Sequence, residues 1–464
     1  MTRWTMGITV TTEPQPEHSG HNDHPDNTGR PSADPAPRHL GFSRRRLIAS
    51  AAVAGGTGAI GAFAGFGAGR SGAADRAEAM PSRDLRGANG PVTEPFYAPH
   101  QSGVETTPQA HAHFLALTLK PGSKAGDVMR WLRLLTADAA ALTQGSGPLA
   151  DSEPELAHDP ARLTITFGFG RGLVKLAGEE SVPKWLGPLE KFPIDDLDPD
   201  RCTGDLLLQI CGDDPLTLAH ARRMLWKDSR NFAEVAWQRD GFRRSYGSQG
   251  EAKTQRNLFG QLDGTANPGP GSEDFARIVW GQGTGRADAV HSARGAPPDD
   301  LGAHLPDWMR GGTTLVLRDI AMNLDTWDKA DRPAREFATG RTLGSGAPLS
   351  GVDEFDVPDF DAVDKRGLTK ISAAAHVARA RDGLNPEMQI HRRTFNYETG
   401  AGEGAGLLFA SFQADIARQF LPIQRRLAEV DLLNEWTTPI GSTVWAIPPG
   451  VKEGEYIGQS LFEG

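Results

Sequence analysis

Strand and helix patterns alternate along residues 113–238 in an order that few folds share. Four short apolar segments have the length and composition of strands, and they lie at residues 113–119, 162–168, 206–211 and 232–238. Residues 124–142 place apolar side chains at helical spacing, and residues 215–227 form a second helical segment. The order strand-helix-strand-strand-helix-strand is that of a ferredoxin-like domain.

A similar order begins again after a stretch, residues 286–310, whose Ala, Pro, Asp and Gly content indicates an inserted loop. The elements expected there are strands at 311–320, 406–412 and 444–448 and helices at 330–337 and 416–427. We therefore predict an α+β protein with two tandem ferredoxin-like domains and antiparallel sheets. The first domain would cover residues 108–285 and the second residues 311–464.

The N-terminal 79 residues have no globular character. Residues 1–40 are rich in Pro, His, Asp and Gly and are expected to be a disordered tail, with His18, His21 and His24 as solvated side chains rather than a metal site. In residues 41–79, Arg44 and Arg45 precede a Gly/Ala-rich apolar run, which is typical of a bacterial twin-arginine export signal. The run has low hydrophobicity and no aromatic belt, which disfavours a membrane anchor.

Export by the twin-arginine machinery implies a periplasmic, cell-envelope or extracellular location. Two cleavage sites are open, one after residues 77–79 (Ala-Glu-Ala) and one after residues 71–73 (Ser-Gly-Ala). Residues 80–107 would then form a linker and the segment that leads into the first domain.

Charge and cysteine content exclude some functions. Acidic residues outnumber basic ones, 59 to 49, which gives a formal net charge of −10 and argues against a nucleic-acid partner. The two cysteines, Cys202 and Cys211, flank an expected strand. Nine extended steps span about 30 Å, whereas a disulfide needs Cα atoms within about 7 Å. We therefore expect two unpaired cysteines.

Three separated motifs carry the chemistry. Asp263 stands in Gly260-Gln261-Leu262-Asp263-Gly264, where the flanking glycines allow a sharp turn or close approach to a flat ligand. His376 follows a run of small residues, and the pair Arg392-Arg393 follows sixteen residues later. A haem peroxidase without a distal histidine needs a carboxylate, an axial histidine and a fixed cation.

These motifs, with residues 96–101, 340–349, 406–413 and 439–441, resemble those of the dye-decolorizing peroxidases, specifically the exported deferrochelatase/peroxidase subgroup. The resemblance covers residues 95–464. It implies two ferredoxin-like halves with one haem b per chain in the second half. It also implies hydrogen peroxide and small-molecule electron donors as substrates.

The resemblance assigns roles to individual residues. His376 would be the axial iron ligand, Asp263 the acid–base group that moves the peroxide proton, and Arg392 the fixed cation. Arg393 would then be a surface residue or a contact of a haem propionate. Thr394 receives no role.

Further residues are expected around the haem. Asp431, with Asp415 as the alternative, would accept a hydrogen bond from the second nitrogen of His376. The backbone at Gly264, Thr265 and Ala266 would lie along the haem, as would Arg381 and Asp382. Aromatic side chains that could relay electrons to bulky donors are Trp308, Trp327, Trp436, Trp445 and Tyr397.

Three functions are compatible with this site. The first is an exported haem b peroxidase that oxidises dyes, phenols or similar donors. The second is a deferrochelatase that releases iron from haem, leaves the porphyrin intact and serves an iron-uptake system. The third is a non-catalytic haem carrier, but a carrier has no use for Asp263 and Arg392. The natural donor and a homo-oligomeric state stay open.

Overall fold

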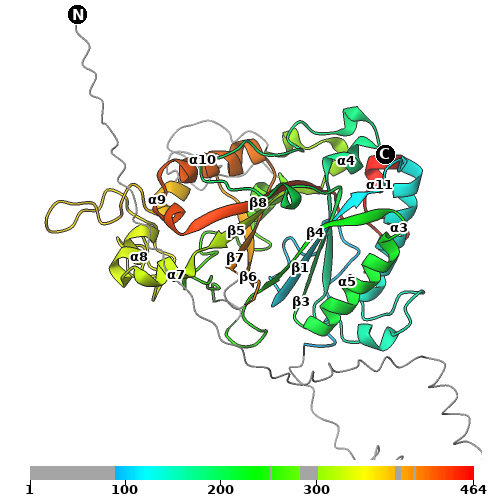
Figure 1. Cartoon of the computed structure of the whole chain (residues 1–464), viewed down its shortest axis with the longest axis horizontal. Coiled ribbons are helices and arrows are strands. Elements are labelled where there is room, and N and C mark those ends of the chain that lie inside the picture. Colours follow the sequence, from blue (N-terminus) through cyan, green and yellow to red (C-terminus); the bar gives the residue numbers. More distant parts are fainter. Residues whose placement is uncertain (1–88, 251–252, 283–300, 382–387, 401–403) are drawn as a thin grey trace, which may run out of the picture. The chain divides into compact units, whose positions relative to one another are not determined.

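A closed barrel of antiparallel strands lies at the centre of the molecule (Figure 1). The computed structural model describes residues 89–250, 253–282, 301–381, 388–400 and 404–464, which all fall in one compact unit, Arg86–Gly464. The barrel strands are β1 (His111–Leu119), β2 (Thr164–Phe169), β3 (Leu206–Gly212), β4 (Ala233–Phe242), β5 (Thr313–Met322), β6 (His391–Glu398), β7 (Ala405–Gln413) and β8 (Thr437–Ile447). Around the barrel they follow the order β1-β3-β2-β8-β5-β7-β6-β4.

The barrel consists of two sheets with the same internal order. In the first sheet the spatial order is β4-β1-β3-β2, and in the second it is β8-β5-β7-β6, so each half arranges its strands as fourth, first, third, second. Long antiparallel ladders join the strands within each sheet, whereas a single residue pair joins the sheets at each seam, Phe169 with Ala446 and Phe242 with Asn396. The predicted pair of ferredoxin-like halves is confirmed.

Side chains alternate between the inside and the outside of the barrel, as the two-residue period of a strand requires. On β1, Phe114 belongs to the buried interior cluster, whereas Leu115 belongs to a second cluster outside the sheet. On β6, Phe395 points inward with the interior cluster. Its sequence neighbours Thr394 and Asn396 therefore face the opposite side of the strand, and this side carries the candidate site.

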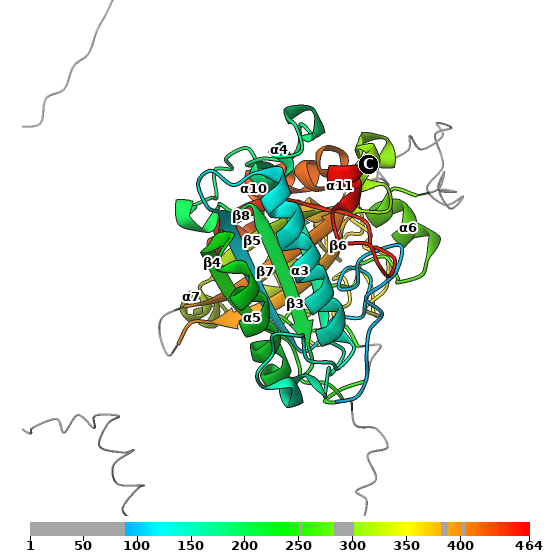
Figure 2. The same ribbon diagram turned by 90° about the vertical axis from the view of Figure 1, so that its right-hand side faces the viewer.

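Helices cover the outer faces of the two sheets. The long helices α3 (Ala125–Thr143) and α5 (Pro215–Ser229) lie side by side across the first sheet (Figure 2). Helix α6 (Glu273–Trp280) instead packs Phe275 and Ile278 into the barrel interior. The shorter helices are α4 (Arg171–Lys175), α7 (Leu324–Lys329), α8 (Arg332–Thr339), α9 (His376–Ala380), α10 (Leu421–Val430) and α11 (Gln459–Glu463). Figure 1 shows α8, α9 and α10 on the side of the barrel away from α3 and α5.

The structure differs from the expected elements in three places. Residues 391–398 form β6, which was not predicted because the segment reads as a charged motif rather than an apolar strand. The predicted helix 416–427 is a π-helical turn, Ile416–Phe420, followed by α10, and β8 begins at Thr437 rather than at 444. The prediction of two unpaired cysteines is confirmed, since Cys202 and Cys211 are both free.

Several predicted segments lie outside the described residues. These are the tail, the export signal, residues 80–88 of the linker, and residues 286–300 of the inserted loop. The described remainder of that loop contains two short 3₁₀ turns, Leu301–His304 and Asp307–Met309. Within the described part of the chain, no helix is both long and apolar enough to span a bilayer.

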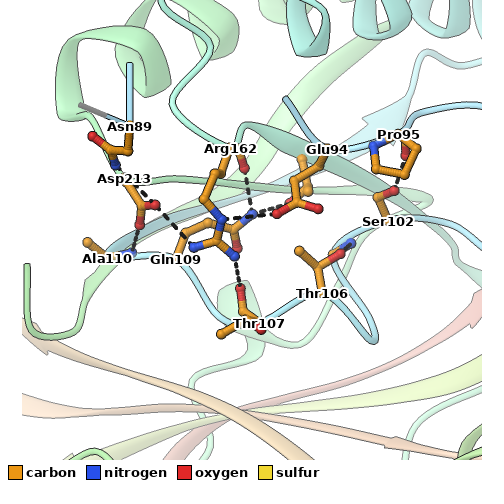
Figure 3. A network of polar contacts seen from close by, with 12 residues as sticks. Asn89, Glu94, Pro95, Ser102, Thr106, Thr107, Gln109, Ala110, Arg162 and Asp213 are labelled. Carbon is orange, nitrogen blue, oxygen red and sulfur yellow. Dashed lines mark hydrogen bonds and ion pairs between the residues drawn. The ribbon is translucent and has the colours of Figure 1, made fainter. Parts of the chain in front are cut away.

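A polar network fixes the chain that precedes β1 (Figure 3). The Arg162 guanidinium donates to Glu94 Oε1 at 3.0 Å, to Asp213 Oδ2 at 3.2 Å and to the carbonyl oxygen of Thr107 at 2.8 Å. The other Asp213 oxygen accepts from the backbone N–H of Ala110 at 2.8 Å. Arg162 itself has a φ of 58°, a left-handed conformation that costs a non-glycine residue about 1–2 kcal/mol. Its ion pairs stabilise this strained turn and anchor the segment.

A buried carboxyl pair lies between α3 and α5. Asp138 and Asp228 share a hydrogen bond, and Oδ2 of each has no other partner among the described residues. Burial and the neighbouring Asp138 raise the pKa of Asp228 to about 8. One proton is therefore held between two carboxyl groups, because two adjacent buried charges of the same sign repel each other.

This pair predicts a pH-dependent stability. The unfolded chain releases the proton near pH 4, whereas the folded protein keeps it until about pH 8, so stability falls as pH rises through this range. Asp228→Asn should raise the free energy of unfolding at pH 8.5 by about 1–3 kcal/mol and change it little at pH 5. Denaturation at both pH values measures the difference, with the exposed-residue variant Asp307→Asn as the control. An equal effect at both pH values would exclude a shared proton.

Candidate functional site

The predicted site residues come from four segments on the outer side of the second sheet. Helix α9 begins with His376, and the residue that follows α10 is Asp431. Asp263 lies at the end of a short hairpin, and Arg392 lies on β6. Far apart in the sequence, these residues approach one another in the fold.

His376 is oriented by a carboxylate. Its Nδ1 lies 2.6 Å from Asp431 Oδ2, and Asp431 is 3% exposed at its side chain. The backbone N–H of Leu432 donates to the carbonyl oxygen of Ala374 at 3.0 Å, which fixes the two segments against each other. Nε2 of His376 has no hydrogen-bond partner among the described residues, and its side chain is 33% exposed. The ring therefore presents one free nitrogen to the space beside it.

Electrostatics agree with this orientation. Burial lowers the pKa of His376, but the charge and hydrogen bond of Asp431 outweigh that effect and raise the pKa above its usual value. A carboxylate that holds Nδ1–H leaves the lone pair of a neutral ring on Nε2 and makes that nitrogen a stronger ligand.

A glycine allows the segment before His376 to pack closely. Gly340 ends α8 with a φ of 79°, and a Cβ at this position would lie 2.5 Å from Val377 Cγ1 and 3.1 Å from Ala375 Cβ. Any larger residue would displace the chain around His376. Gly340 lies in residues 340–349, one of the segments that resemble the family. Its close contact with Val377 and Ala375 explains why this position needs a residue without a Cβ.

Asp263 is held in place by a short hairpin. Arg256 pairs with Leu262, and the backbone N–H of Asp263 donates to the carbonyl oxygen of Gln255 at 2.9 Å. Gly264 follows with a φ of 123°, so the chain turns sharply after the carboxylate. The hairpin thus fixes the aspartate backbone while its side chain stays 9% exposed.

Arg392 and Thr394 on β6 both approach Asp263. Arg392 Nη1 lies 3.3 Å from Asp263 Oδ1, and Thr394 Oγ1 donates to Asp263 Oδ2 at 3.3 Å. Each carboxylate oxygen therefore has its own partner. At this separation Arg392 and Asp263 can bind each other, and each of them can instead bind a ligand.

Asn267 fixes β6 relative to the hairpin loop. Its Oδ1 accepts from the backbone N–H of Arg392 at 3.0 Å, and its Nδ2 donates to the Arg392 carbonyl oxygen at 2.7 Å. Gln255 adds a second connection, since its Nε2 donates to Thr394 Oγ1 at 3.0 Å. The spacing between Asp263 and Arg392 is thus set by backbone contacts and not by the ion pair alone.

The Asp263–Arg392 pair and His376 interact electrostatically. The charges of Arg392 and Asp263 both act on the pKa of His376. Burial, together with the charges of Arg381 and Arg392, lowers the pKa of Arg341 despite the opposing effect of Glu354. Arg381 and Arg392 therefore lie close enough to Arg341 for their charges to act on it.

These residues fit a haem. Nε2 of His376, which has no hydrogen-bond partner among the described residues, would supply a ligand to the haem iron, and the residues just before it, Ser372–Ala375, are small. Arg341 and Arg381 supply positive charge that two propionate carboxylates require. Asp263 and Arg392 form an ion pair with each other and make no hydrogen bond to His376, so they remain available for chemistry.

Arg393 does not have the predicted position. It is fully buried on the inward side of β6 and donates hydrogen bonds to the Thr106 carbonyl oxygen and to Gln109 Oε1. The expectation of a surface or propionate contact is wrong, because alternation along β6 turns Arg393 away from the site. Gln109 Nε2 also donates to the Arg162 carbonyl oxygen at 2.7 Å, so Arg393 ties β6 to the network of Figure 3.

His391 cannot act as a distal histidine. It is 5% exposed, and its ring lies 4.9 Å from that of Phe275 on the inward side of β6. Burial, with the charges of Arg393 and Arg392, lowers its pKa to about 3. It is therefore a neutral ring that faces the barrel interior, which leaves Asp263 as the candidate acid–base group of this site.

The remaining predicted residues have the following positions. Thr265 Oγ1 donates to Glu354 at 2.9 Å, so the loop of Gly264, Thr265 and Ala266 is anchored beside Asp263. Arg381 ends α9, whereas Asp382 lies outside the described residues. Asp415, the alternative to Asp431, instead caps the π-helical turn through the backbone N–H groups of Ala417 and Arg418.

Among the aromatic candidates, two lie next to the hairpin. The Trp327 ring stacks on Phe259 at 4.4 Å and meets Trp436 edge-on at 5.1 Å. Trp445 and Tyr397 lie in the barrel interior, and Trp308 belongs to the cluster of the first half. Electron relay through any of them stays a prediction.

Sequence reasoning missed the residues that support the site. Asn267, Gln255, Thr394 and Arg341 received no role, although the first two follow or precede the Asp263 motif closely. A polar residue within eight positions of a catalytic candidate is a weak signal, because such residues are common in loops. Asn267 and Gln255 differ from other polar loop residues in their contacts with β6, which become visible only in the structure.

Two family models match most of the chain. Residues 101–243 match the model described as Dyp-type peroxidase, N-terminal, and residues 254–452 match Dyp-type peroxidase, C-terminal. All the described residues of the candidate site fall in the second range.

Curated relatives and solved structures are similar over the same region. The chain is 35% identical over 378 residues to a dye-decolorizing peroxidase of Thermobifida fusca (strain YX), which covers 78% of this chain and 84% of the relative. It is 31% identical over 387 residues to the deferrochelatase of Escherichia coli (strain K12), which covers 79% and 87%. A DyP-type peroxidase from Cellulomonas bogoriensis superposes with a TM-score of 0.73 at 45% identity, over 81% of this chain and 100% of that one. Ferric DtpA from Streptomyces lividans superposes with a TM-score of 0.72 at 36% identity, over 83% and 100%.

Proposed function

Because this chain belongs to the Dyp-type peroxidases, a family of haem-dependent oxidoreductases that use hydrogen peroxide, we propose that it is an exported peroxidase that oxidises dyes, phenols or similar donors. The observation that carries the proposal is the Asp263–Arg392 pair, whose two charges act on His376. A haem carrier would need His376 alone.

Asp263 is suited to move the peroxide proton. Peroxide must lose a proton from one oxygen and gain it on the other before water can leave, which is general acid–base work. The Asp263 carboxylate accepts the proton from the near oxygen and returns it to the far oxygen. Haem bound through His376 would supply the two electrons that reduce the peroxide, and two donor molecules return one electron each.

Arg392 and Thr394 assist this transfer. Arg392 stabilises negative charge that develops as the O–O bond breaks. Thr394 orients the carboxylate by donating to Oδ2. Since the backbone of Arg392 is fixed by Asn267, the guanidinium needs little rearrangement to reach the peroxide.

Rapid mixing tests the proposed function. The haem-bound protein is mixed with hydrogen peroxide, and the spectrum is followed before and after a phenol or an anthraquinone dye is added. A fast spectral change that the donor reverses supports a peroxidase. A spectrum that does not respond to peroxide would leave haem carriage as the function.

Iron release is the second candidate, and the similarity to deferrochelatases favours it. It would produce free protoporphyrin, which fluoresces strongly, whereas haem does not. Incubation of the protein with haem, followed by porphyrin fluorescence, separates the two functions. Under peroxidase turnover the proposal expects oxidised donor and no stoichiometric free porphyrin.

The export signal is tested by its arginines, which lie outside the described residues. Arg44→Lys combined with Arg45→Lys should leave most of the protein folded and haem-bound in the cytoplasm, because the twin-arginine pair is read as a unit. Fractionation of expressing cells measures this, with Arg38→Lys as the control. Normal amounts of the double variant outside the cytoplasm would contradict export by this route.

A further inference from the structure

A second cleft lies in the other half of the molecule, far along the chain from the haem site. It has a volume of about 490 Å³ and opens between α5 and the outer face of strands β1 and β4. Ligand sites in proteins commonly have volumes of roughly 300–1,000 Å³. Nothing in the peroxidase chemistry uses this cleft.

Its walls are apolar and aromatic. Leu115 on β1, Val235 on β4 and Leu216 on α5 line the cleft, and Trp226 adds an indole ring. Leu216 and Val235 are 59% and 40% exposed, although both are large apolar residues. Such residues gain free energy when a ligand covers them.

The polar lining is positive. Arg222 and Arg223 line the cleft, and among the described lining residues none is Asp or Glu. Arg223 is paired with Glu153 outside the lining. Arg222, in contrast, has no hydrogen bond or ion pair within the described parts of the chain, and the side chain of Gln238 opposite α5 has none either.

The nearest carboxylates are already engaged. Asp240 feels the charge of Arg222, but it accepts a hydrogen bond from His113 Nδ1 at 2.6 Å. Asp151 is fully buried at its side chain and lies 2.8 Å from Nε2 of His220, a ring that forms part of the cleft wall. The cleft therefore has an arginine whose guanidinium makes no hydrogen bond or ion pair among the described residues.

We propose that this cleft binds a small aromatic carboxylate. The arginine at position 222 would pair with the carboxylate, with Gln238 as a second donor, and the Trp226 ring, one helical turn along α5, would contact the aromatic ring. Arginine is well suited to this task, because its planar fork matches the two oxygens of a carboxylate. The site is independent of the haem and of the proposed peroxidase function.

Titration calorimetry with 4-hydroxybenzoate tests the proposal on the haem-bound protein with cyanide on the iron, which blocks the haem pocket. Wild type should bind one molecule per chain. Arg222→Gln should weaken binding at least tenfold, because it removes the charge. Trp226→Leu should weaken it about two- to tenfold, because it removes the ring contact. Both variants should keep the wild-type haem spectrum and peroxide reaction rate.

Two probes and one control make the test specific. The uncharged 4-hydroxybenzyl alcohol should bind at least tenfold more weakly than the acid. Arg130→Gln, a change at an exposed arginine on α3, should bind the acid as wild type does. Sedimentation shows whether a second copy of the chain covers the cleft instead. No binding at millimolar probe, unchanged affinity in Arg222→Gln, or a dimer that Arg222→Gln dissociates would each overturn the proposal.

Discussion

His376→Ala should abolish stable haem binding. No other histidine of the described chain presents a free nitrogen to this space, because His391 faces the barrel interior and His220 and His113 are hydrogen-bonded to carboxylates in the other half. The loss of the axial ligand leaves only propionate and apolar contacts. The ratio of Soret to protein absorbance after purification with added haem measures the effect.

Two further variants test whether the loss of haem is specific to His376. Asp431→Asn should keep haem but lower its affinity about 10–100-fold, because the amide no longer supports the ligand as a carboxylate does. His158→Ala, which removes an exposed histidine of the first half, should bind haem as wild type does. If His376→Ala retains full haem with a normal ferric spectrum, the ligand is another residue.

Asp263→Asn should slow the reaction with peroxide about 10²–10⁴-fold and leave the resting haem spectrum nearly unchanged. The amide preserves the shape of the side chain but cannot accept the proton. Arg392→Leu should slow the reaction by at least about 10²-fold, because a fixed charge is lost and Asp263 loses its charged partner. Stopped-flow mixing with peroxide gives both rates.

The pH profile sharpens this test. A histidine base has an ordinary pKa of about 6.5 and is mostly protonated in acid, whereas an aspartate has an ordinary pKa of about 3.9. A peroxidase with an aspartate base therefore stays active in mildly acid solution.

Two further variants serve as comparisons. Thr394→Val should slow the reaction with peroxide less than Asp263→Asn or Arg392→Leu does, and Arg310→Leu, a change at an exposed arginine, should not slow it. A wild-type rate for Asp263→Asn across the acid range would make Asp263 a turn residue only.

Local patterns predicted most of the fold. Periodicity identified seven of the eight barrel strands, together with α3 and α5, since these segments have an apolar face of the correct period. Strand β6 was missed because its inward side carries Arg393, a buried charge that breaks the apolar alternation. Tertiary contacts with Thr106 and Gln109 compensate for that charge, and no local pattern reveals them.

The candidate site was predictable only in part. Motifs and family resemblance identified Asp263, His376, Arg392 and Asp431, and the structure brings these four together, while their roles await the variants. The distinction between Arg392 and Arg393 needed the strand, because neighbouring residues on a strand face opposite sides. Gly340 and Asn267 act across 36 and 125 positions of sequence separation, on His376 and Arg392, and such contacts depend on the complete fold.

Because the strand order repeats, the two halves of the barrel are related to each other like the two subunits of a dimer, although they belong to one chain. The two halves have similar sheets. They differ in the segment that connects the first strand to the second, which is residues 120–163 in the first half and residues 323–390 in the second. The short crossing contains α3, which packs on its sheet. The long crossing contains both Gly340 and His376, together with helices α8 and α9. The candidate haem ligand therefore lies on the longer of two equivalent crossings, and the first half has no crossing of that length.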